Sequence, residues 1–345
     1  MKPMYDRAQD IKKLVDGASK IVIIQADNPD ADSLGSALAL EHILGDLGKE
    51  PFLYCGVDMP GYLRYVAGWD RVSKELPAQF DLSFIVDAST MTLLERLVDN
   101  GYQSRLSVKP CVVLDHHAIV DHEVPFASVT INDPSRASAG ELIYFLAKQL
   151  EWPLSVETQG FLMNSILGDT QGLTNQLAKA ETYRVMAEFV DSGVDRPALE
   201  ELRREYGRMP QAIFRYKGEL IKRAEFSADD RVAHVTIPQA EINEFSPLYN
   251  PAPLIQGDML QTTGVGVAIV FKLYGDGKIT AAIRCNSGNP IAGQLAEHFG
   301  GGGHAFASGF KITDGRGFDD VKAECLRLAA ELLDKLKTDE QHETV

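Results

Sequence analysis

Acidic and imidazole side chains follow several apolar segments of this chain, and such side chains bind divalent metal ions. Residues 112–114 are apolar and lead directly into Asp115, His116 and His117. Further apolar segments that lead to aspartates lie at 21–24, 82–86 and 166–168. In an open parallel sheet, ligands bind at the carboxyl ends of the strands. The sequence therefore predicts a site for hard divalent metals at one edge of a sheet.

Five side chains have the types that a pair of divalent ions needs, namely several anionic oxygens and an imidazole. They are Asp30, Asp32, Asp87, His116 and Asp169. Asp30 and Asp32 lie two residues apart, so each can face a different ion, and Asp87 suits a bridging role. Such a pair would activate a water molecule and stabilise both sides of a phosphoryl displacement.

Each motif alone has a simpler structural explanation. An Asp-x-Asp sequence is commonly a turn or a helix cap, and an aspartate after a strand commonly caps the next helix. A His-His pair by itself is weak evidence. The conjunction favours the metal site, because each acid follows a strand-like segment or ends a buried helix in the same half of the chain.

Strands and helices alternate in that half. Strands are predicted at 20–25, 51–54, 82–86 and 110–114. Helices are predicted at 6–18, 34–47, 60–67, 138–150, 155–168 and 178–194, and residues 118–136 are expected to be irregular. This alternation predicts an α/β fold with a doubly wound parallel sheet.

A mixed-charge helical segment at 195–225 precedes a different pattern. A solvated linker helix explains its charges more simply than a nucleic-acid contact does. Beyond it we expect strands at 231–237, 265–274 and 278–284, a hairpin turn at 275–277, and helices at 290–299 and 318–337. These elements predict a smaller α/β domain with a mixed sheet, and we expect the active site in the cleft between the domains. The predicted boundaries are 1–190 for the metal-binding domain, 191–225 for the linker, 226–338 for the second domain and 339–345 for a polar tail.

Composition limits the classes of function. The 345 residues carry a formal net charge of −15, which argues against a protein that coats duplex DNA. We find no apolar run long enough to cross a bilayer and no signal peptide. The four cysteines lie far apart without a CxxC pair, so we expect reduced core thiols and a cytoplasmic protein.

The chain resembles the DHH phosphoesterase family with its DHH-associated C-terminal domain, and the resemblance covers nearly the whole sequence. The residues that carry it are the NPDADSLGS sequence at 28–36, Asp87, Asp115-His116-His117, the GDTQG sequence at 168–172, Arg284, and the GGGGH sequence at 300–304. Each motif alone is short, whereas the set is highly specific. The resemblance implies that the site lies in a metal-dependent phosphoesterase.

The resemblance also implies a role for each residue. One ion would be held by Asp30 and Asp87. The other would be held by a larger set: Asp32, Asp87, His116 and Asp169. The ions would usually be manganese, one or two in number, with magnesium or cobalt as alternatives. His117 would contact the attacked phosphate or act as an acid, and Asp115 would orient the imidazoles.

A second group of residues would hold the substrate. By resemblance, the terminal phosphate or base of the substrate would be bound by Arg284, Gly301, Gly302, Gly303 and His304. Glycines let backbone amides approach a ligand closely, and a guanidinium suits a phosphate. A flexible turn explains the glycines equally well.

The resemblance sets the expected substrates and partners. The length of the chain and its two-domain layout are most similar to those of the nano-RNase and bisphosphatase branch of the family. We therefore expect hydrolysis of short oligoribonucleotides, dinucleotides or nucleoside 3′,5′-bisphosphates, with cyclic dinucleotide chemistry also represented among relatives. No membrane or duplex DNA partner is expected, and a homodimer is left open.

One position departs from the family pattern. A histidine usually lies four residues before the first acid and binds the first metal, but Ala26 occupies that position here. Alanine cannot ligate a metal, so the first ion needs Gln25, Asp27 or water instead. The outcomes are an altered two-metal enzyme, a one-metal enzyme, or a protein that binds nucleotides without hydrolysing them. We favour retained activity because every other ligand position is kept.

Overall fold

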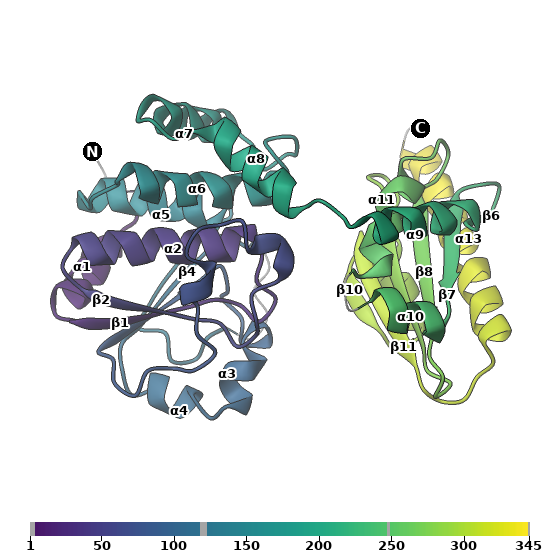
Figure 1. Ribbon diagram of the computed structural model, residues 1–345, viewed down its shortest axis with the longest axis horizontal. Helices are drawn as coiled ribbons and strands as arrows, with labels where there is room; N and C mark the ends of the chain where they lie inside the picture. The colour runs from purple at the N-terminus through teal and green to yellow at the C-terminus, as the bar shows by residue number, and fades with distance from the viewer. Residues whose placement is uncertain (1–3, 118–122, 247–248, 344–345) are drawn as a thin grey trace. The chain divides into compact units, whose positions relative to one another are not determined.

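The computed structural model describes residues 4–117, 123–246 and 249–343. The chain divides into two compact units, Met1–Arg208 and Met209–Val345 (Figure 1). The segment 191–225, expected as a linker, contributes α8 (Arg196–Tyr206) to the first unit and α9 (Gln211–Lys222) to the second. The domain boundaries inferred from sequence otherwise stay a prediction.

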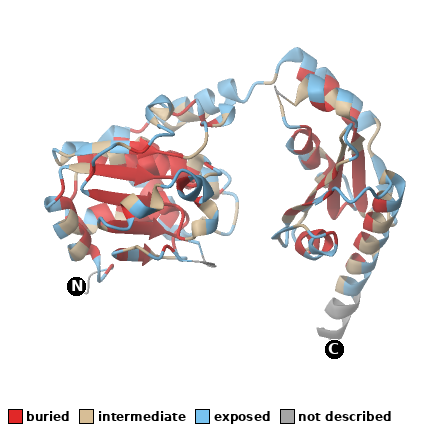
Figure 2. Ribbon diagram, turned by 90° about the horizontal axis from the view of Figure 1, so that it is seen from below, coloured by how far each residue is buried: buried red, intermediate tan, exposed pale blue. Residues whose placement is uncertain are grey.

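A parallel sheet forms the centre of the first unit. Its strands lie in the order β2 (Glu50–Tyr54), β1 (Lys20–Ile24), β3 (Leu82–Val86), β4 (Cys111–Asp115) and β5 (Val129–Asn132). The central strands are buried on both faces, as Figure 2 shows, which explains their continuous apolar sequences. In this order β2 is added on one side of β1 and β3 on the other, and ligands bind at such a switch point.

Helices cover both faces of this sheet, as the doubly wound prediction requires. One face carries α1 (Ala8–Asp16), α2 (Ala31–Asp46), α5 (Ala139–Leu150), α6 (Val156–Asp169) and α7 (Ala180–Asp191). The other face carries the short helices α3 (Glu95–Asp99) and α4 (Gln103–Leu106) (Figure 1). The predicted fold class is confirmed.

Two local predictions for the first unit are wrong. Residues 118–136 were expected to be irregular, but β5 lies within them and pairs with β4. The alternating burial of β5 is too short a signal to find in sequence, because only Val129 and Ile131 face the core. The helix expected at 60–67 is a single 3₁₀ turn, η1 (Gly61–Leu63), and the next glycine, Gly68, adopts a left-handed conformation. Two more 3₁₀ turns, η2 (Trp69–Arg71) and η3 (Met91–Leu93), follow.

Close packing between α2 and α6 positions one side of the site. A methyl group on Gly35 of α2 would lie 2.7 Å from the carbonyl oxygen of Phe161 on α6. A methyl group on Gly168 of α6 would lie 2.7 Å from the Cβ of Ala31. Only glycine permits these distances. The contact brings Asp32 and Asp169, at the ends of the two helices, to the same place.

The second unit has a mixed sheet, as expected. Its strands lie in the order β10 (Gly302–His304), β11 (Ala307–Ile312), β9 (Ile279–Cys285), β8 (Val267–Leu273), β7 (Val232–Ile237) and β6 (Glu225–Ser227). Among the described strands of this sheet, β7 and β8 pair in parallel and the other pairs are antiparallel. Helices α9, α10 (Gln239–Phe245), α11 (Pro251–Leu260), α12 (Ala292–His298) and α13 (Phe318–Glu343) complete two apolar clusters.

Two C-terminal predictions need correction. The glycine-rich segment was expected to be a loop, but its last residues form β10, which pairs with β11. The last helix was expected to end at 337, and α13 continues to Glu343. Its final residues are polar in sequence, so the apolar periodicity that marks a helix stops before the helix does.

The state of the cysteines agrees with the sequence analysis. All four cysteines are free, and Cys55, Cys111 and Cys325 are buried. No helix among the described residues combines the length and the apolar character that a membrane span needs.

Candidate metal centre

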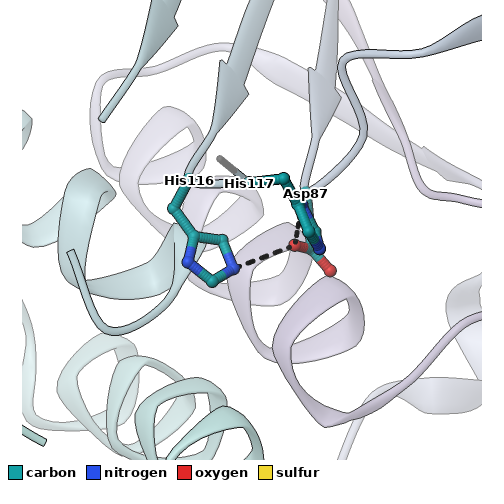
Figure 3. A group of neighbouring side chains, drawn as sticks. All are labelled: Asp87, His116 and His117. Carbon is teal, nitrogen blue, oxygen red and sulfur yellow. Dashed lines mark ion pairs between the residues drawn. The ribbon is translucent and has the colours of Figure 1, made fainter. Parts of the chain in front are cut away.

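The predicted ligands meet where β1, β3 and β4 end. Asp32 lies in the first turn of α2, which follows β1, and Asp87 follows β3. His116 and His117 follow β4, and Asp169 is the last residue of α6. Two sets of side chains offer ligand atoms within 4.8 Å of one another: Asp32, His116 and Asp169, and Asp87, His116 and His117. Figure 3 shows the second set, with Asp87 facing both imidazoles.

His116 lies at the centre of these groups. Its Nε2 atom is 3.0 Å from Asp169 Oδ2, 3.3 Å from Asp32 Oδ2 and 3.6 Å from Asp87 Oδ1. Its other ring nitrogen, Nδ1, lies 3.4 Å from the carbonyl oxygen of Arg136. A carbonyl at Nδ1 fixes the ring and favours the tautomer that presents Nε2 to a metal.

Two buried atoms of this group have no hydrogen bond. They are His116 Nε2 and Asp87 Oδ1, which face each other across 3.6 Å. Buried polar atoms in proteins nearly always have a hydrogen-bond partner or ligate an ion. The nitrogen and oxygen donors that surround them suit a hard or borderline divalent cation. The residues present therefore fit a metal ion.

Asp32 is the most constrained of the ligands. Its carboxylate is fully buried and accepts hydrogen bonds from Ser165 Oγ (2.6 Å), Ser36 Oγ (2.8 Å) and the backbone N–H of Ala139 (2.8 Å). Ala139 is the first residue of α5, where free N–H groups and the helix dipole favour an anion. Burial opposes ionisation, but His116 and these donors lower the pKa of Asp32 below its ordinary value.

Asp115 holds His117 rather than a metal. Its Oδ1 lies 2.7 Å from His117 Nδ1 and accepts the backbone N–H of His116. Ser89 Oγ donates to the other oxygen. Burial opposes ionisation, but the hydrogen bonds from His117 and Ser89 lower the pKa of Asp115 to about 2. His117 is half exposed, and the bond to Asp115 raises its pKa.

The carboxylates of the centre repel one another. Burial and the nearby charges of Asp32, Asp30 and Asp169 raise the pKa of Asp87 well above its ordinary value. Burial and Asp32 raise the pKa of Asp169 to about 6. Burial alone would lower the pKa of His116, but Asp169 and Asp32 raise it to about 11. The group favours positive charge at its centre, which divalent cations supply.

Asp30 takes a different position from the other predicted ligands. It is the N-cap of α2, and its Oδ1 accepts the N–H of Ser33 at 3.0 Å. Neither of the two close sets includes it. Burial and the charge of Asp32 raise the pKa of Asp30. Ligation by Asp30 stays a prediction.

Of the two residues that flank Ala26, Asp27 is engaged elsewhere, whereas Gln25 has a buried amide without a hydrogen-bond partner. Ala26 is buried in the apolar cluster below the sheet. Asp27 is used elsewhere, because its Oδ2 accepts the N–H of Arg96 at 2.7 Å. Gln25 is fully buried, and neither atom of its amide has a hydrogen bond.

The predicted substrate residues lie in the second unit. Strand register places Arg284 opposite Ala307, and Ala307 opposite His304, in one row across β9, β11 and β10. Arg284 is exposed; the side chain of His304 lies outside the described residues. A methyl group on Gly301 or Gly303 would lie within 2.6 Å of a backbone oxygen of β11, whereas Gly302 faces open space. Packing against β11 is therefore enough to require glycine at positions 301 and 303.

Sequence reasoning missed the residues that hold the ligands. Ser165, Ser36 and Ser89 donate to Asp32 and Asp115, and the Arg136 carbonyl orients His116. The start of α5 was visible as a Ser-Ala-Gly-Glu sequence. Nothing in the sequence links that helix start, or Ser165, to Asp32, because the contact depends on how three helices pack.

Comparisons with known proteins identify a domain family in each part of the chain. Residues 20–167 match the DHH family, N-terminal domain, and residues 252–336 match the DHHA1 domain. The chain is 24% identical over 315 residues to the bifunctional oligoribonuclease and PAP phosphatase NrnA of Bacillus subtilis, covering 90% of this chain and 95% of the relative. It is 27% identical over 307 residues to NrnA of Thermus thermophilus, covering 87% and 86%.

A solved structure shares the fold over almost the full length. It is an exopolyphosphatase-related protein from Bacteroides fragilis, with a TM-score of 0.81 at 21% identity, covering 95% of this chain and 97% of that one. The matched domains, the convergent aspartates and the Asp-His-His sequence after β4 agree with one another. This chain belongs to the DHH family of phosphoesterases and carries a DHHA1 domain in its C-terminal part.

Proposed function

We propose that this protein hydrolyses phosphate esters in short oligoribonucleotides, dinucleotides or nucleoside 3′,5′-bisphosphates. The observation that carries the proposal is the pair of buried, unbonded atoms His116 Nε2 and Asp87 Oδ1, surrounded by Asp32 and Asp169. When bound there, divalent ions would supply a nucleophilic water at neutral pH and neutralise charge on the phosphate.

The ligand set favours unequal binding of two ions. Asp32, Asp87, His116 and Asp169 offer four donors to one ion. The other ion would have Asp30 and Asp87, without the histidine that Ala26 replaces. We propose manganese, with magnesium and cobalt as alternatives, because carboxylates together with one imidazole suit these ions. One ion should bind tightly and the second weakly.

His117 is the candidate for proton transfer. Its Nδ1 is fixed by Asp115, so the ring orientation is set while Nε2 is left for the substrate. Half exposure lets the ring reach a bound phosphate. We propose that His117 contacts the attacked phosphate and protonates the leaving oxygen, and that Asp115 is a positioning residue.

The substrate class is the finer part of the proposal. The NrnA relatives are named for oligoribonuclease and PAP phosphatase activities. Arg284 is exposed and in register with the end of the glycine segment. We propose that Arg284, His304 and the amides of Gly301–Gly303 bind a terminal phosphate, which favours short ligands.

A substrate panel tests this function. Hydrolysis of pApA, adenosine 3′,5′-bisphosphate, cyclic di-AMP and a five-nucleotide RNA would be measured with added manganese. Asp87→Asn is the control, since it keeps the size of the side chain and removes the charge. Turnover of a linear compound that the control loses supports the proposal, and turnover only of long single-stranded DNA contradicts it.

A nucleotide-binding protein without catalysis is the second candidate function. It is favoured by the first motif, where Ala26 is buried among apolar side chains and Asp27 is bound to Arg96. Metal content per chain, measured by elemental analysis after dialysis against manganese, separates the two. Metal near zero together with retained nucleotide binding would support the second candidate.

A further inference from the structure

A large cavity opens beside the metal centre within the first unit. Its volume is about 670 Å³, which falls in the range of small-molecule sites. Its floor includes Ala31, between Asp30 and Asp32, and Gly168, next to Asp169. We call it the α8 cavity, because α8 supplies one wall.

The walls of the α8 cavity combine cationic and aromatic groups. Arg196, Arg203 and Arg204 line it, against the single carboxylate of Glu200. Glu200 binds both Arg203 (2.8 Å) and Arg204 (2.9 Å). Arg196 has no ion pair with any residue that the structure describes. The cavity is therefore locally positive in a chain whose net charge is −15, and it suits an anion.

Tyr62 links the cavity to the metal centre. Its hydroxyl donates to the carbonyl oxygen of Pro29, in the loop that carries Asp30, at 3.0 Å. Its side chain is 59% exposed and borders the cavity. An exposed ring beside guanidinium groups is the usual combination for binding unpaired bases.

We propose that the α8 cavity binds the nucleotides of a single-stranded oligoribonucleotide that continue past the phosphate being cleaved. Phosphates would contact Arg196, Arg203 and Arg204, and a base would stack on Tyr62. The inference rests on the proposed function, because it assumes that the cleaved phosphate lies at the metal centre. It assigns the charges of α8 to nucleic-acid contact rather than to solvation alone.

A binding experiment tests the cavity independently of catalysis. Fluorescein-labelled penta-adenylate would be titrated against the full-length protein in EDTA, with anisotropy as the readout and potassium chloride varied. Arg196→Ala should reduce the slope of log affinity against log salt by about 0.7, the value for one phosphate contact on a single strand. Arg196→Glu should weaken binding on the order of tenfold, and Arg196→Lys should retain the slope.

Two further variants separate charge from stacking. Tyr62→Leu keeps bulk and removes the aromatic face, so affinity should fall on the order of tenfold with the salt slope unchanged. Arg184→Ala removes an exposed arginine of α7 that does not line the cavity. This control should bind penta-adenylate as the wild type does.

Kinetics then connect the cavity to the reaction. Adenosine 3′,5′-bisphosphate has no nucleotide beyond the phosphate that is cleaved. Arg196→Ala should therefore raise KM for penta-adenylate at least about fivefold more than KM for the bisphosphate. Equal changes for both substrates, or wild-type binding by Arg196→Glu, would overturn the inference. If the wild type turns over neither substrate, the proposed function fails, and the anisotropy series alone decides whether the cavity binds RNA.

Discussion

Asp32 of the metal centre and Arg284 of the second sheet are both charged site residues, but they are held in opposite ways. Asp32 is fully buried and accepts hydrogen bonds from two serines and the start of α5. Arg284 is exposed, and its guanidinium donates only to the carbonyl of the preceding residue among the described contacts. Several hydrogen bonds therefore hold the first side chain, whereas one holds the second.

Because of this difference, substitutions in the two regions should reduce metal or substrate affinity by different amounts. A buried carboxylate is tolerated because the fold supplies donors and a metal supplies positive charge. Its geometry is fixed before a metal or substrate binds, so metal affinity depends on the residues behind it. An exposed arginine loses side-chain entropy when it binds a phosphate, and part of its attraction is screened by salt. Substitutions at the metal centre should therefore reduce activity more than substitutions of Arg284.

Loss of His116 should have the largest effect. His116→Ala removes the nitrogen that faces the carboxylates of Asp32, Asp87 and Asp169. Three acids would then crowd one site with one ligand fewer, so we expect metal affinity to collapse and kcat/KM to fall by about 1,000-fold or more. Elemental analysis and steady-state kinetics with saturating manganese measure both. Near-normal turnover by this variant would show that the buried centre is not the reactive site.

Removal of a residue that only holds a ligand should have a smaller effect. Ser165→Ala deletes the 2.6 Å hydrogen bond to Asp32 without touching the other ligands. Residues of this kind typically contribute about 10- to 100-fold to metal affinity, and we expect a loss in that range by calorimetric titration with manganese. Ser83→Ala is the matched control, because it removes another buried serine hydroxyl in the same unit, on β3. Equal losses in the two variants would mean that the effect is general destabilisation.

The sequence was sufficient to predict that Asp32, Asp87, His116 and Asp169 converge, although Asp30 lies in neither close set. Asp32, Asp87 and His116 each come after a buried parallel strand, and the topology rule for such sheets brings strand ends to one edge. Asp169 was predicted from the end of a buried helix. Local pattern and general sheet topology contain this information, because they depend on residues that are near in sequence.

The sequence was not sufficient where the answer depends on contacts between distant segments. Ser165 lies 133 residues from Asp32, and its role follows from how α6 packs on α2. The α8 cavity also depends on the distance between a helix and the 3₁₀ turn at Tyr62. Burial alternates along the four residues of β5, and β10 has three residues. Neither strand is long enough to give a periodic signal in the sequence. These features required the tertiary structure.

Two glycines of the same helix test how tightly the packing behind the metal centre is specified. Gly35→Ala places a methyl group 2.7 Å from the Phe161 carbonyl, and we expect it to reduce the free energy of unfolding by about 1–3 kcal/mol. Gly45→Ala has no atom within 4 Å of the new methyl, so it should raise that free energy by about 0.5–1 kcal/mol. Urea unfolding measures both. Similar stabilities in the two variants would contradict the close α2–α6 contact.

Substitution of Arg284 should cause the smallest loss of activity. The kinetic parameter that changes should distinguish Arg284 from the metal ligands. Arg284→Ala removes a guanidinium that the fold does not hold in place, so we expect KM to rise about tenfold while kcat and metal content stay close to the wild-type values. Lys311→Ala, at an exposed position of neighbouring β11, is the matched control for lost charge. Because the contact is exposed, the difference between Arg284→Ala and the wild type should shrink as salt is raised. A fall in kcat with unchanged KM would instead place Arg284 among the residues that act in the transition state, and the contrast between a rigid metal centre and an adaptable phosphate contact would not hold.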